Sequence, residues 1–370
     1  MKVKSILLSL SLLISSISVH ADQYHYENLL VGGPAIGLGG SFVAIADDLS
    51  AMHYNPAGLM GQQSTRSASV NTMSWESTEF ISAFNDGSDF SRNSFTVVPG
   101  FMGINGNFDN WSIGSYFTIL DFSRERATAE TDSVLPPTAI LPTTILKEYV
   151  NYDFDNSTYK LGFAAAYSYS PKLSIGTSIA LKYSTVETHQ EAGAILTFSG
   201  SEGDITSEFG AVRRSDLTEY ILQPSLGVLW KGQALSFGAK LSKDFVVDSQ
   251  FDSIERLSAP IVSIIANQPT TAYRFSTTSD IKQKLPLSVS LGSAYSSRGY
   301  VLSFQVNHYQ SINDAVSYTD YGLPINRKLK QVTNFALGFK MPILNESALS
   351  IGFYTDKSNG IVDNHIRYQR

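Results

Sequence analysis

The stretch from Leu173 to Thr185, LSIGTSIALKYST, alternates between two kinds of side chain. Its odd positions are Leu, Ile, Thr, Ile, Leu, Tyr and Thr, and its even positions are Ser, Gly, Ser, Ala, Lys and Ser. Successive side chains of a β-strand point to opposite faces, so this stretch predicts a strand with one apolar and one polar face. The same pattern recurs from residue 235 and from residue 285.

Strands of this kind are predicted along the whole chain after residue 63. We count eleven, at about 65–75, 92–105, 109–122, 156–170, 172–190, 216–231, 233–247, 281–297, 299–313, 328–343 and 346–356. Short turns alternate with long polar connections, which cover about 76–91, 123–155, 191–215, 248–280, 314–327 and 357–365. Long strands with this alternation are typical of outer-membrane barrels. The sequence therefore predicts an all-β, transmembrane antiparallel β-barrel.

Aromatic residues support a barrel independently. We consider the alternate positions of each strand that carry its apolar residues, here called the apolar parity; the other set is expected to face the lumen and is called the inward or lumen parity. On the apolar parity, one group of aromatic residues falls at the short-turn ends of the strands: Trp111, Tyr167, Tyr169, Trp230, Tyr295 and Tyr300. A second group falls near the long connections: Tyr159, Tyr183, Tyr220 and Phe245. Girdles of this kind mark the two interfaces of a membrane. A soluble β-sandwich is the alternative, but it would need neither strands of this length nor aromatics sorted to their ends.

The end of the sequence predicts an incomplete barrel. Residues 366–370, IRYQR, resemble the start of a twelfth strand. Bacterial barrels normally have an even number of strands, and an open edge in hydrocarbon leaves backbone groups unpaired. We therefore expect a barrel, residues 63–370, that is truncated at its C-terminus. Closure in another way or by a partner chain is the alternative.

Residues 1–21 are predicted to be a secretory signal peptide. Lys2 and Lys4 precede an apolar core at 6–17, and Val19-His20-Ala21 supplies a small-residue cleavage site. A signal anchor is the alternative. The chain has no cysteine, which excludes disulfides and thiolate metal sites, and no basic run, which argues against nucleic acid as a partner. With the barrel, these features predict a multi-pass protein of the outer membrane of a Gram-negative bacterium.

A stretch dense in small residues precedes the strands, from Gly32 to Leu59. Three parts of it resemble the N-terminal hatch of the FadL-type family of outer-membrane transporters for long-chain fatty acids and other hydrophobic compounds. They are Gly37-Leu38-Gly39-Gly40, FVAIADD at 42–48, and Tyr54-Asn55-Pro56-Ala57-Gly58-Leu59. The layout of strands and connections extends the resemblance over residues 22–370.

The resemblance implies a fold and a function. The family pattern is a fourteen-stranded barrel with a hatch in its lumen, here residues 22–62, so that three strands would be missing from this chain. The implied function is passive diffusion of hydrophobic compounds across the outer membrane. The ligand enters from outside through loops and leaves through a gap in the wall beside a kinked strand. No energy source and no cofactor is expected.

The resemblance also places candidate site residues. The family's asparagine-proline-alanine element maps onto Asn55, Pro56 and Ala57, which are expected beside the lateral opening. Gly39 and Gly40 belong to the predicted hatch. Gly114, on the lumen parity of the third strand, is a candidate for the kink. Asp47 and Asp48 are acids that pair with lumen cations or do no more than cap a turn.

The inward parity carries four lysines, Lys160, Lys182, Lys240 and Lys340. Either they solvate a wet lumen, or some of them bind a ligand carboxylate or latch the hatch. Lys160, Lys182 and Lys240 are the ligand-binding candidates. The hatch has no lysine or arginine between Asp22 and Gly61, so an anionic head group must meet the wall or a loop.

Two long connections contain apolar segments. VLPPTAILPTTIL, at 134–146, is rich in proline, and IERLSAPIVSIIA, at 254–266, is compatible with a short amphipathic helix. Either these segments capture a hydrophobic ligand, or they pack on each other over the barrel mouth. The capture hypothesis assigns ligand contacts to Leu135, Ile140, Leu141, Leu257, Ile261, Ile264 and Ile265.

Signals for an enzyme are poor. No histidine pair has a metal-ligand spacing, no G-x-S-x-G motif occurs, and the glycine cluster lacks the βαβ context of a dinucleotide site. No catalytic residue, metal site or cofactor is therefore predicted. The expected partners are a hydrophobic small molecule, outer-membrane lipid and the barrel-assembly machinery, for a monomeric channel. A docking barrel for a secretion or assembly complex and an outer-membrane lipid hydrolase are the alternatives.

Overall fold

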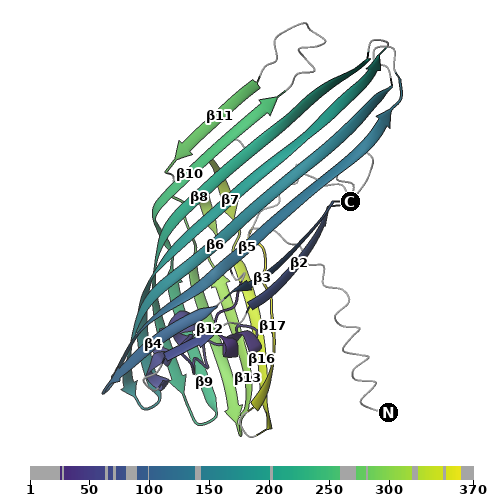
Figure 1. Cartoon of the computed structure of the whole chain (residues 1–370). Helices are drawn as coiled ribbons and strands as arrows, with labels where there is room; N and C mark the ends of the chain where they lie inside the picture. Colours follow the sequence, from purple (N-terminus) through teal and green to yellow (C-terminus); the bar gives the residue numbers. More distant parts are fainter. Residues whose placement is uncertain are drawn as a thin grey trace, which may run out of the picture.

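The computed structural model describes residues 26, 29–62, 66–69, 72–80, 90–98, 100–137, 143–200, 203–258, 272–280, 282–318, 324–344 and 347–359. The predicted signal peptide and residues 366–370 lie outside this part of the chain. One antiparallel sheet dominates the fold (Figure 1). Its main path runs β1-β4-β5-β6-β7-β8-β9-β12-β13-β16-β17.

The strands of this path match the eleven predicted strands in order. They are β1 (Arg66–Ser69), β4 (Phe101–Phe108), β5 (Trp111–Leu135), β6 (Thr144–Ser170), β7 (Leu173–Gly200), β8 (Gly203–Lys231), β9 (Leu235–Lys243), β12 (Leu287–Ser297), β13 (Tyr300–Tyr309), β16 (Val332–Leu344) and β17 (Ser347–Tyr354). Within the described strands, β1 pairs only with β4 and β17 only with β16, so the sheet is open between them. A closed, fourteen-stranded barrel stays a prediction.

Most of the predicted long connections are strands instead of loops. β5 to β8 are 25 to 29 residues long and rise beyond the other strands (Figure 1). The remaining extensions are β10 (Phe245–Ser258), β11 (Ala272–Ser279), and the separate hairpins β2 (Thr72–Phe80)–β3 (Phe90–Val98) and β14 (Ile312–Tyr318)–β15 (Pro324–Leu329). The predicted strand 92–105 is divided between β3 and β4, next to a Pro-Gly pair that interrupts ladder hydrogen bonding.

Two corrections concern the apolar connections. Leu135 is the last residue of β5, and residues 254–258 belong to β10, so no helix begins at Ile254. Ile140, Leu141, Ile261, Ile264 and Ile265 lie outside the described residues, and only the backbone of Leu257 is described. The capture role of these residues stays a prediction.

The outer face of the sheet has the two predicted aromatic rows. At the short-turn ends, Trp111, Trp230 and Tyr300 are exposed. The second row, here called the tyrosine row, is Tyr159, Tyr183 and Tyr220, which are direct cross-strand partners. On β8 the rows are separated by the ten residues from Tyr220 to Trp230, roughly 34 Å along a strand or about 26 Å after a tilt of about 40°. This height fits the apolar band of a membrane barrel.

The two faces of the sheet exchange polarity at the tyrosine row. Below it, β6 presents Leu161 and Phe163 outward. Beyond it, the outward-facing positions of β6 carry Asp155 and Asp153. The inward-facing positions carry Phe154, Tyr152, Val150 and Leu146, with Glu148 among them. The β7–β8 ladder has no register shift, so the exchange comes from the residues and not from a slip. We call residues 121–135, 144–158, 184–200 and 203–219 the distal sheet.

The N-terminal segment, residues 31–62, lies inside the curve of the sheet near the short-turn ends (Figure 1). It forms α2 (Gly33–Gly37), α3 (Ala51–Tyr54) and the 3-10 helix η1 (Pro56–Gly61). Phe42, Leu49, Met52 and Leu59 are fully buried and share a core with the wall residues Phe101, Tyr116, Ala164, Ala166 and Ala294. No helix among the described residues is long and apolar enough to cross a membrane.

Candidate functional site

Glycines on the inner face of the sheet give the N-terminal segment room to approach the wall. A Cβ at Gly338 would lie 2.7 Å from Cβ of Leu38, and Gly238 is in direct contact with the backbone of Val43. The same relation holds for Gly176, Gly227, Gly292 and Gly352, which face residues of the segment. The small-residue composition of both partners therefore permits backbone-to-backbone packing.

The predicted hatch element Asn55-Pro56-Ala57 anchors the segment to β7 and β8. The Asn55 amide donates to the carbonyls of Val43 (2.9 Å) and Val228 (3.0 Å), and its Oδ1 accepts from the Ala57 amide (3.2 Å). Asn55 also caps η1, with Pro56 at the favoured first position. The β7–β8 ladder opposite has no register shift, so a role at a lateral opening stays a prediction.

Other candidates from the sequence have local roles in the segment. Gly39 and Gly40 have φ values of 62° and 78°, which favour glycine, and Gly39 packs on the backbone of β17. Oδ1 of Asp48 accepts from the amide and the hydroxyl of Ser50 (2.8 and 2.5 Å). Burial raises the pKa of the Asp48 carboxyl, and these bonds oppose the rise. No salt bridge of Asp47 or Asp48 is found among the described residues, but the charge of Asp47 acts on Lys231 of β8, so their pairing with lumen cations stays a prediction.

The strand is not irregular at Gly114, which was the candidate position for the kink. The β4–β5 and β5–β6 ladders run regularly through it, and the irregularity of β5 falls between Ile119 and Asp121. A Cβ at Gly114 would lie 2.7 Å from Sδ of Met52. Gly114 therefore makes room for the N-terminal segment.

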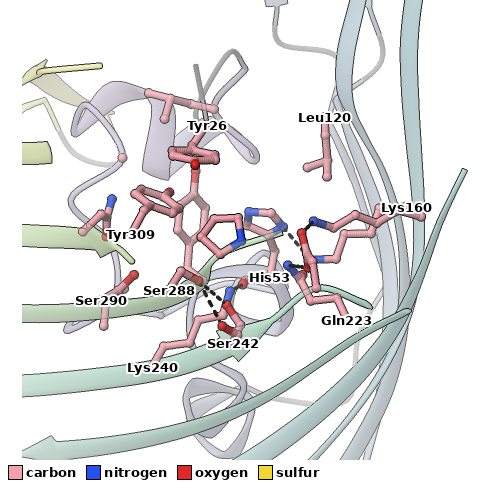
Figure 2. A pocket seen from close by; sticks show the side chains of 18 of the residues that line it. Tyr26, His53, Leu120, Lys160, Gln223, Lys240, Ser242, Ser288, Ser290 and Tyr309 are labelled. Atoms are coloured by element: carbon pink, nitrogen blue, oxygen red, sulfur yellow. Dashed lines mark hydrogen bonds and ion pairs between the residues drawn. The ribbon is translucent and has the colours of Figure 1, made fainter. Parts of the chain in front are cut away.

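A cavity of about 200 Å³ lies between the N-terminal segment and the wall (Figure 2). We call it the lysine pocket, because Lys160, Lys182 and Lys240 line it; Lys340 does not. Its other walls include His53, Gln223, Asp244, Gln305 and the apolar or aromatic residues Tyr26, Leu29, Leu30, Tyr54, Leu120, Leu285, Pro286 and Tyr309. The structure thus brings together the three lysines proposed as ligand-binding residues.

A network of polar contacts crosses the lysine pocket. Nζ of Lys160 donates to Oε1 of Gln223 (2.6 Å) and lies 3.4 Å from Nδ1 of His53. Nζ of Lys240 donates to the carbonyl of His53 (2.5 Å). Lys182 and Gln223 are both bonded to the Asp244 carboxylate at 2.6 Å. The network links the N-terminal segment, through His53, to β6 and β9.

His53 is the residue of the N-terminal segment that contacts two of the pocket lysines. Its pKa is held well below the usual value, first by burial and then by the charges of Lys160, Lys240 and Lys182. The imidazole is therefore neutral at pH 7, and Nδ1 accepts from Lys160 if Nε2 carries the proton. Sequence reasoning missed His53, Gln223, Asp244 and Gln305. Gln223, Asp244 and Gln305 had a detectable signal, since each is a polar residue at an inward-facing position of a predicted strand, whereas His53 had none.

Gln305 is a second anchor of the segment. Its Oε1 accepts from the amides of both Phe42 and Val43 at 2.9 Å, and its Nε2 donates to Oδ1 of Asn307, on the same strand, at 2.9 Å. These bonds satisfy two buried backbone donors that no helix or strand partner reaches. The N-terminal segment is thus held by β13 as well as by β8.

The sheet, with a polar inner face enclosing a buried segment, defines the class as an outer-membrane β-barrel transport fold. The chain is similar to the toluene transporter TbuX of Ralstonia pickettii (TM-score 0.56, 14% identity, 89% of this chain and 87% of that chain). It is also similar to a FadL homologue of Pseudomonas aeruginosa (0.57, 13%, 90% and 82%) and to the toluene transporter TodX of P. putida (0.58, 12%, 91% and 84%).

These likenesses confirm the predicted FadL-type fold, and at such identities they speak for the fold alone. No protein-family model matches the sequence, and no curated protein matches it. Among the described residues, no group of three or more His, Asp or Glu side chains is placed to hold a metal ion.

Proposed function

We propose that this chain is an outer-membrane channel for the passive uptake of hydrophobic compounds and belongs to the FadL-type family. Two of the similar structures are toluene transporters, TbuX and TodX. The chemistry of the inner face supports the extension to this chain, because a pocket with apolar and cationic walls lies inside the sheet. A pocket lined mostly by apolar groups with a few placed polar groups is the usual form of a small-molecule site.

The proposed route begins outside the membrane. A hydrophobic compound arrives at the distal sheet, whose inward side chains include Val150 and Phe154, and passes the tyrosine row to the lysine pocket. Below the pocket, the N-terminal segment acts as the hatch. The compound leaves sideways through the wall into the membrane, down its gradient and without a cofactor.

The observation that carries this proposal is the place of the lysine pocket. It lies between the wall and the N-terminal segment, and both contribute lining residues, among them Lys160 and Lys240 from the wall and His53 from the segment. A ligand in the pocket therefore touches the part of the molecule that has to move for passage. A lipid hydrolase would need a nucleophile and a base in contact, and among the described residues that line the pocket no hydrogen bond joins a serine to His53.

Uptake in cells tests the proposal. A strain that lacks this protein should take up labelled toluene or palmitate more slowly than the same strain carrying the full chain, with equal growth on glucose as the control. Unchanged uptake of both compounds, together with a protein complex that co-purifies with the chain, would favour the docking-barrel alternative and contradict transport.

A further inference from the structure

The outer face of the sheet beyond the tyrosine row carries arginines of two kinds. On β5, Arg124 and Arg126 form ion pairs with aspartates of β6, at 2.9 and 3.3 Å. On β10 and β11, Arg256 and Arg274 are exposed, and no ion pair of either is found among the described residues. The partners of the first two arginines account for their place on this face, whereas the second two have no acid that does so.

Arg256 and Arg274 lie directly opposite each other on neighbouring strands. The direct partner of Arg256 on β8 is Val212, so Arg214, two positions along β8, is its diagonal neighbour on the same face. We call Arg214, Arg256 and Arg274 the arginine patch; it spans the adjacent strands β8, β10 and β11 (Figure 1). Like charges directly opposite each other destabilise a sheet, so an anion bound at the patch would offset this cost.

The acids near the arginine patch already have hydrogen-bond partners. Both carboxylate oxygens of Asp216 accept from Nε of Arg214, at 3.4 and 3.1 Å. The oxygens of Asp252 accept from the side chains of Gln250 and Thr278, at 2.8 and 2.7 Å. Both acids lie closer to the tyrosine row than the arginines of β10 and β11 do. The part of the patch without an acid is therefore the part farther from the membrane.

The chemistry of the arginine patch suits a phosphate group. A guanidinium group is planar and always charged, and its fork of donors matches two oxygens of a phosphate. A phosphate monoester carries a charge of about −1.5 to −2 at pH 7, whereas a carboxylate carries a single charge. Guanidinium groups from three adjacent strands therefore match a phosphate better than a carboxylate.

The height of the patch indicates where the phosphate comes from. The eight residues from Tyr220 back to Val212, the partner of Arg256, span roughly 26 Å along β8, or about 20 Å above the tyrosine row after a tilt of about 40°. The polar headgroup region of a bilayer is only about 5–8 Å deep on each side. Phospholipid phosphates therefore lie below the patch, and the extended sugar headgroup of a glycolipid is needed to reach it.

We propose that the arginine patch docks the phosphorylated sugar headgroups of glycolipids in the outer leaflet of the membrane. The patch continues the lipid-facing wall of β8, where Leu226 and Val228 are exposed below the tyrosine row. One glycolipid can therefore keep its acyl chains against this wall while its sugars reach the arginines. The proposal depends on the outer-membrane location and not on which compound the channel carries.

Binding to the purified full chain in detergent at low salt tests the proposal, with lipopolysaccharide that carries phosphates on its core sugars as the probe. Arg256→Gln/Arg274→Gln should bind the probe at least about tenfold more weakly, because charge-assisted bonds are lost. Lysine at both positions should retain part of the affinity, since the charge stays and the fork is lost. Removal of the core phosphates from the probe should weaken wild-type binding and abolish the difference between wild type and the glutamine variant.

A matched control is Arg124→Gln/Arg126→Gln, which removes two arginines from the same face that have aspartate partners. It should change the affinity by less than about twofold. Urea titration in liposomes without glycolipid reports on the fold. Arg256→Gln/Arg274→Gln should be at least as stable there as wild type, because two like charges are removed.

Equal affinity of wild type and Arg256→Gln/Arg274→Gln for lipopolysaccharide would overturn the proposal, as would an equal loss in the control variant. Inorganic phosphate or an acidic peptide that binds the patch as tightly as the glycolipid would identify a free anion or a protein as the partner, and would overturn it too. Uptake of hydrophobic compounds is measured separately, so failure of this test leaves the proposed function standing.

Discussion

The membrane-level part of β6 and β7 and the distal sheet are made of the same strands but have opposite chemistry. Below the tyrosine row the apolar side chains point outward, as at Ile179, and the polar ones inward, as at Lys160 and Lys182. Beyond the row, Asp155 and Glu187 point outward and Phe154 and Val186 inward. The backbone geometry is continuous, so the surroundings decide which face is apolar. We infer that lipid lies outside the first region and water outside the second.

This comparison also locates the membrane. The apolar outer face ends where Tyr159, Tyr183 and Tyr220 pair, and residues 184–200 of β7 then extend roughly 55 Å further at about 3.3 Å per residue. The ion pairs Arg124–Asp155 and Arg126–Asp153 stand on the outer face just beyond the row. Charged pairs at this height are compatible with water and headgroups but not with hydrocarbon.

The largest expected effect comes from a charge on the lipid face. Ile179 is 50% exposed on β7, midway between the aromatic rows. Ile179→Arg should destabilise the folded protein in a bilayer by about 2–4 kcal/mol, because the charge meets hydrocarbon. Urea titration in liposomes measures this loss. Thr185→Arg, with the same parity but beyond the row, should change stability by less than about 0.5 kcal/mol; equal losses at both positions would remove the proposed boundary.

The inward face of the distal sheet gives the second prediction. Leu146 is 8% exposed, whereas its outward neighbour Ile145 is 47% exposed. Leu146→Ala should lower the free energy of local unfolding by about 2 kcal/mol, since it removes a buried side chain. Hydrogen exchange of the β6–β7 amides measures it. Ile145→Ala is the matched control, and a larger loss there would mean that the apolar faces have been assigned the wrong way round.

The third prediction concerns the N-terminal segment, which lies inside the membrane-level part of the sheet. Asn55→Ala leaves the carbonyls of Val43 and Val228 without the amide that donates to them. The loss should lower the free energy of unfolding by about 1–2 kcal/mol. The sheet should still fold and insert, while the N-terminal segment loosens and hydrophobic uptake falls. Uptake assays and ion conductance in planar bilayers measure these changes. Gln62→Ala, which removes only a 3.5 Å bond to Ala46, should behave like wild type; wild-type uptake in Asn55→Ala would count against an anchor.

The smallest effect is expected at the exposed ion pairs. Arg124→Ala removes a bond of 2.9 Å to Asp155 in which both side chains are exposed. Its cost should be at most about 0.5 kcal/mol, and it should shrink further in high salt. Urea midpoints at two salt concentrations measure this. A loss comparable to that of Ile179→Arg would show that Arg124 lies in a medium of low dielectric.

Sequence reasoning reached the strand path and both aromatic rows, because period-two alternation is a local signal. It ended β7 near residue 190 and treated 191–215 as a loop, although β7 and β8 are a continuous hairpin there. Beyond Tyr183 and Tyr220 the apolar residues move to the opposite set of alternate positions. A prediction that expects apolar residues at the same set throughout therefore ends the strand too early. The distal sheet could not be predicted without knowing what lies on each side of it.

In the lysine pocket too, some residues could be predicted from strand alternation and others could not. Parity placed Lys160, Lys182 and Lys240 on one face, and the structure brings them into one cavity. His53 comes from a different part of the chain and meets Lys160 only through the packing of the N-terminal segment. Contacts between residues more than 100 positions apart leave no local pattern. The anchoring of Asn55 on Val228 escaped prediction for the same reason.

We expect the surroundings of the outer face to change from lipid to water at the tyrosine row, and site-directed spin labelling of β7 tests this most directly. The chain has no cysteine, so single cysteines at outward positions of β7 can be labelled without background. A spin label at Ile175, Ile179, Leu181, Glu187, His189 or Glu191 reports accessibility to oxygen in lipid and to a nickel chelate in water. Lipid accessibility should dominate through Leu181 and water accessibility from Glu187 onward. Lipid accessibility at Glu187 and Glu191 equal to that at Ile179 would contradict it.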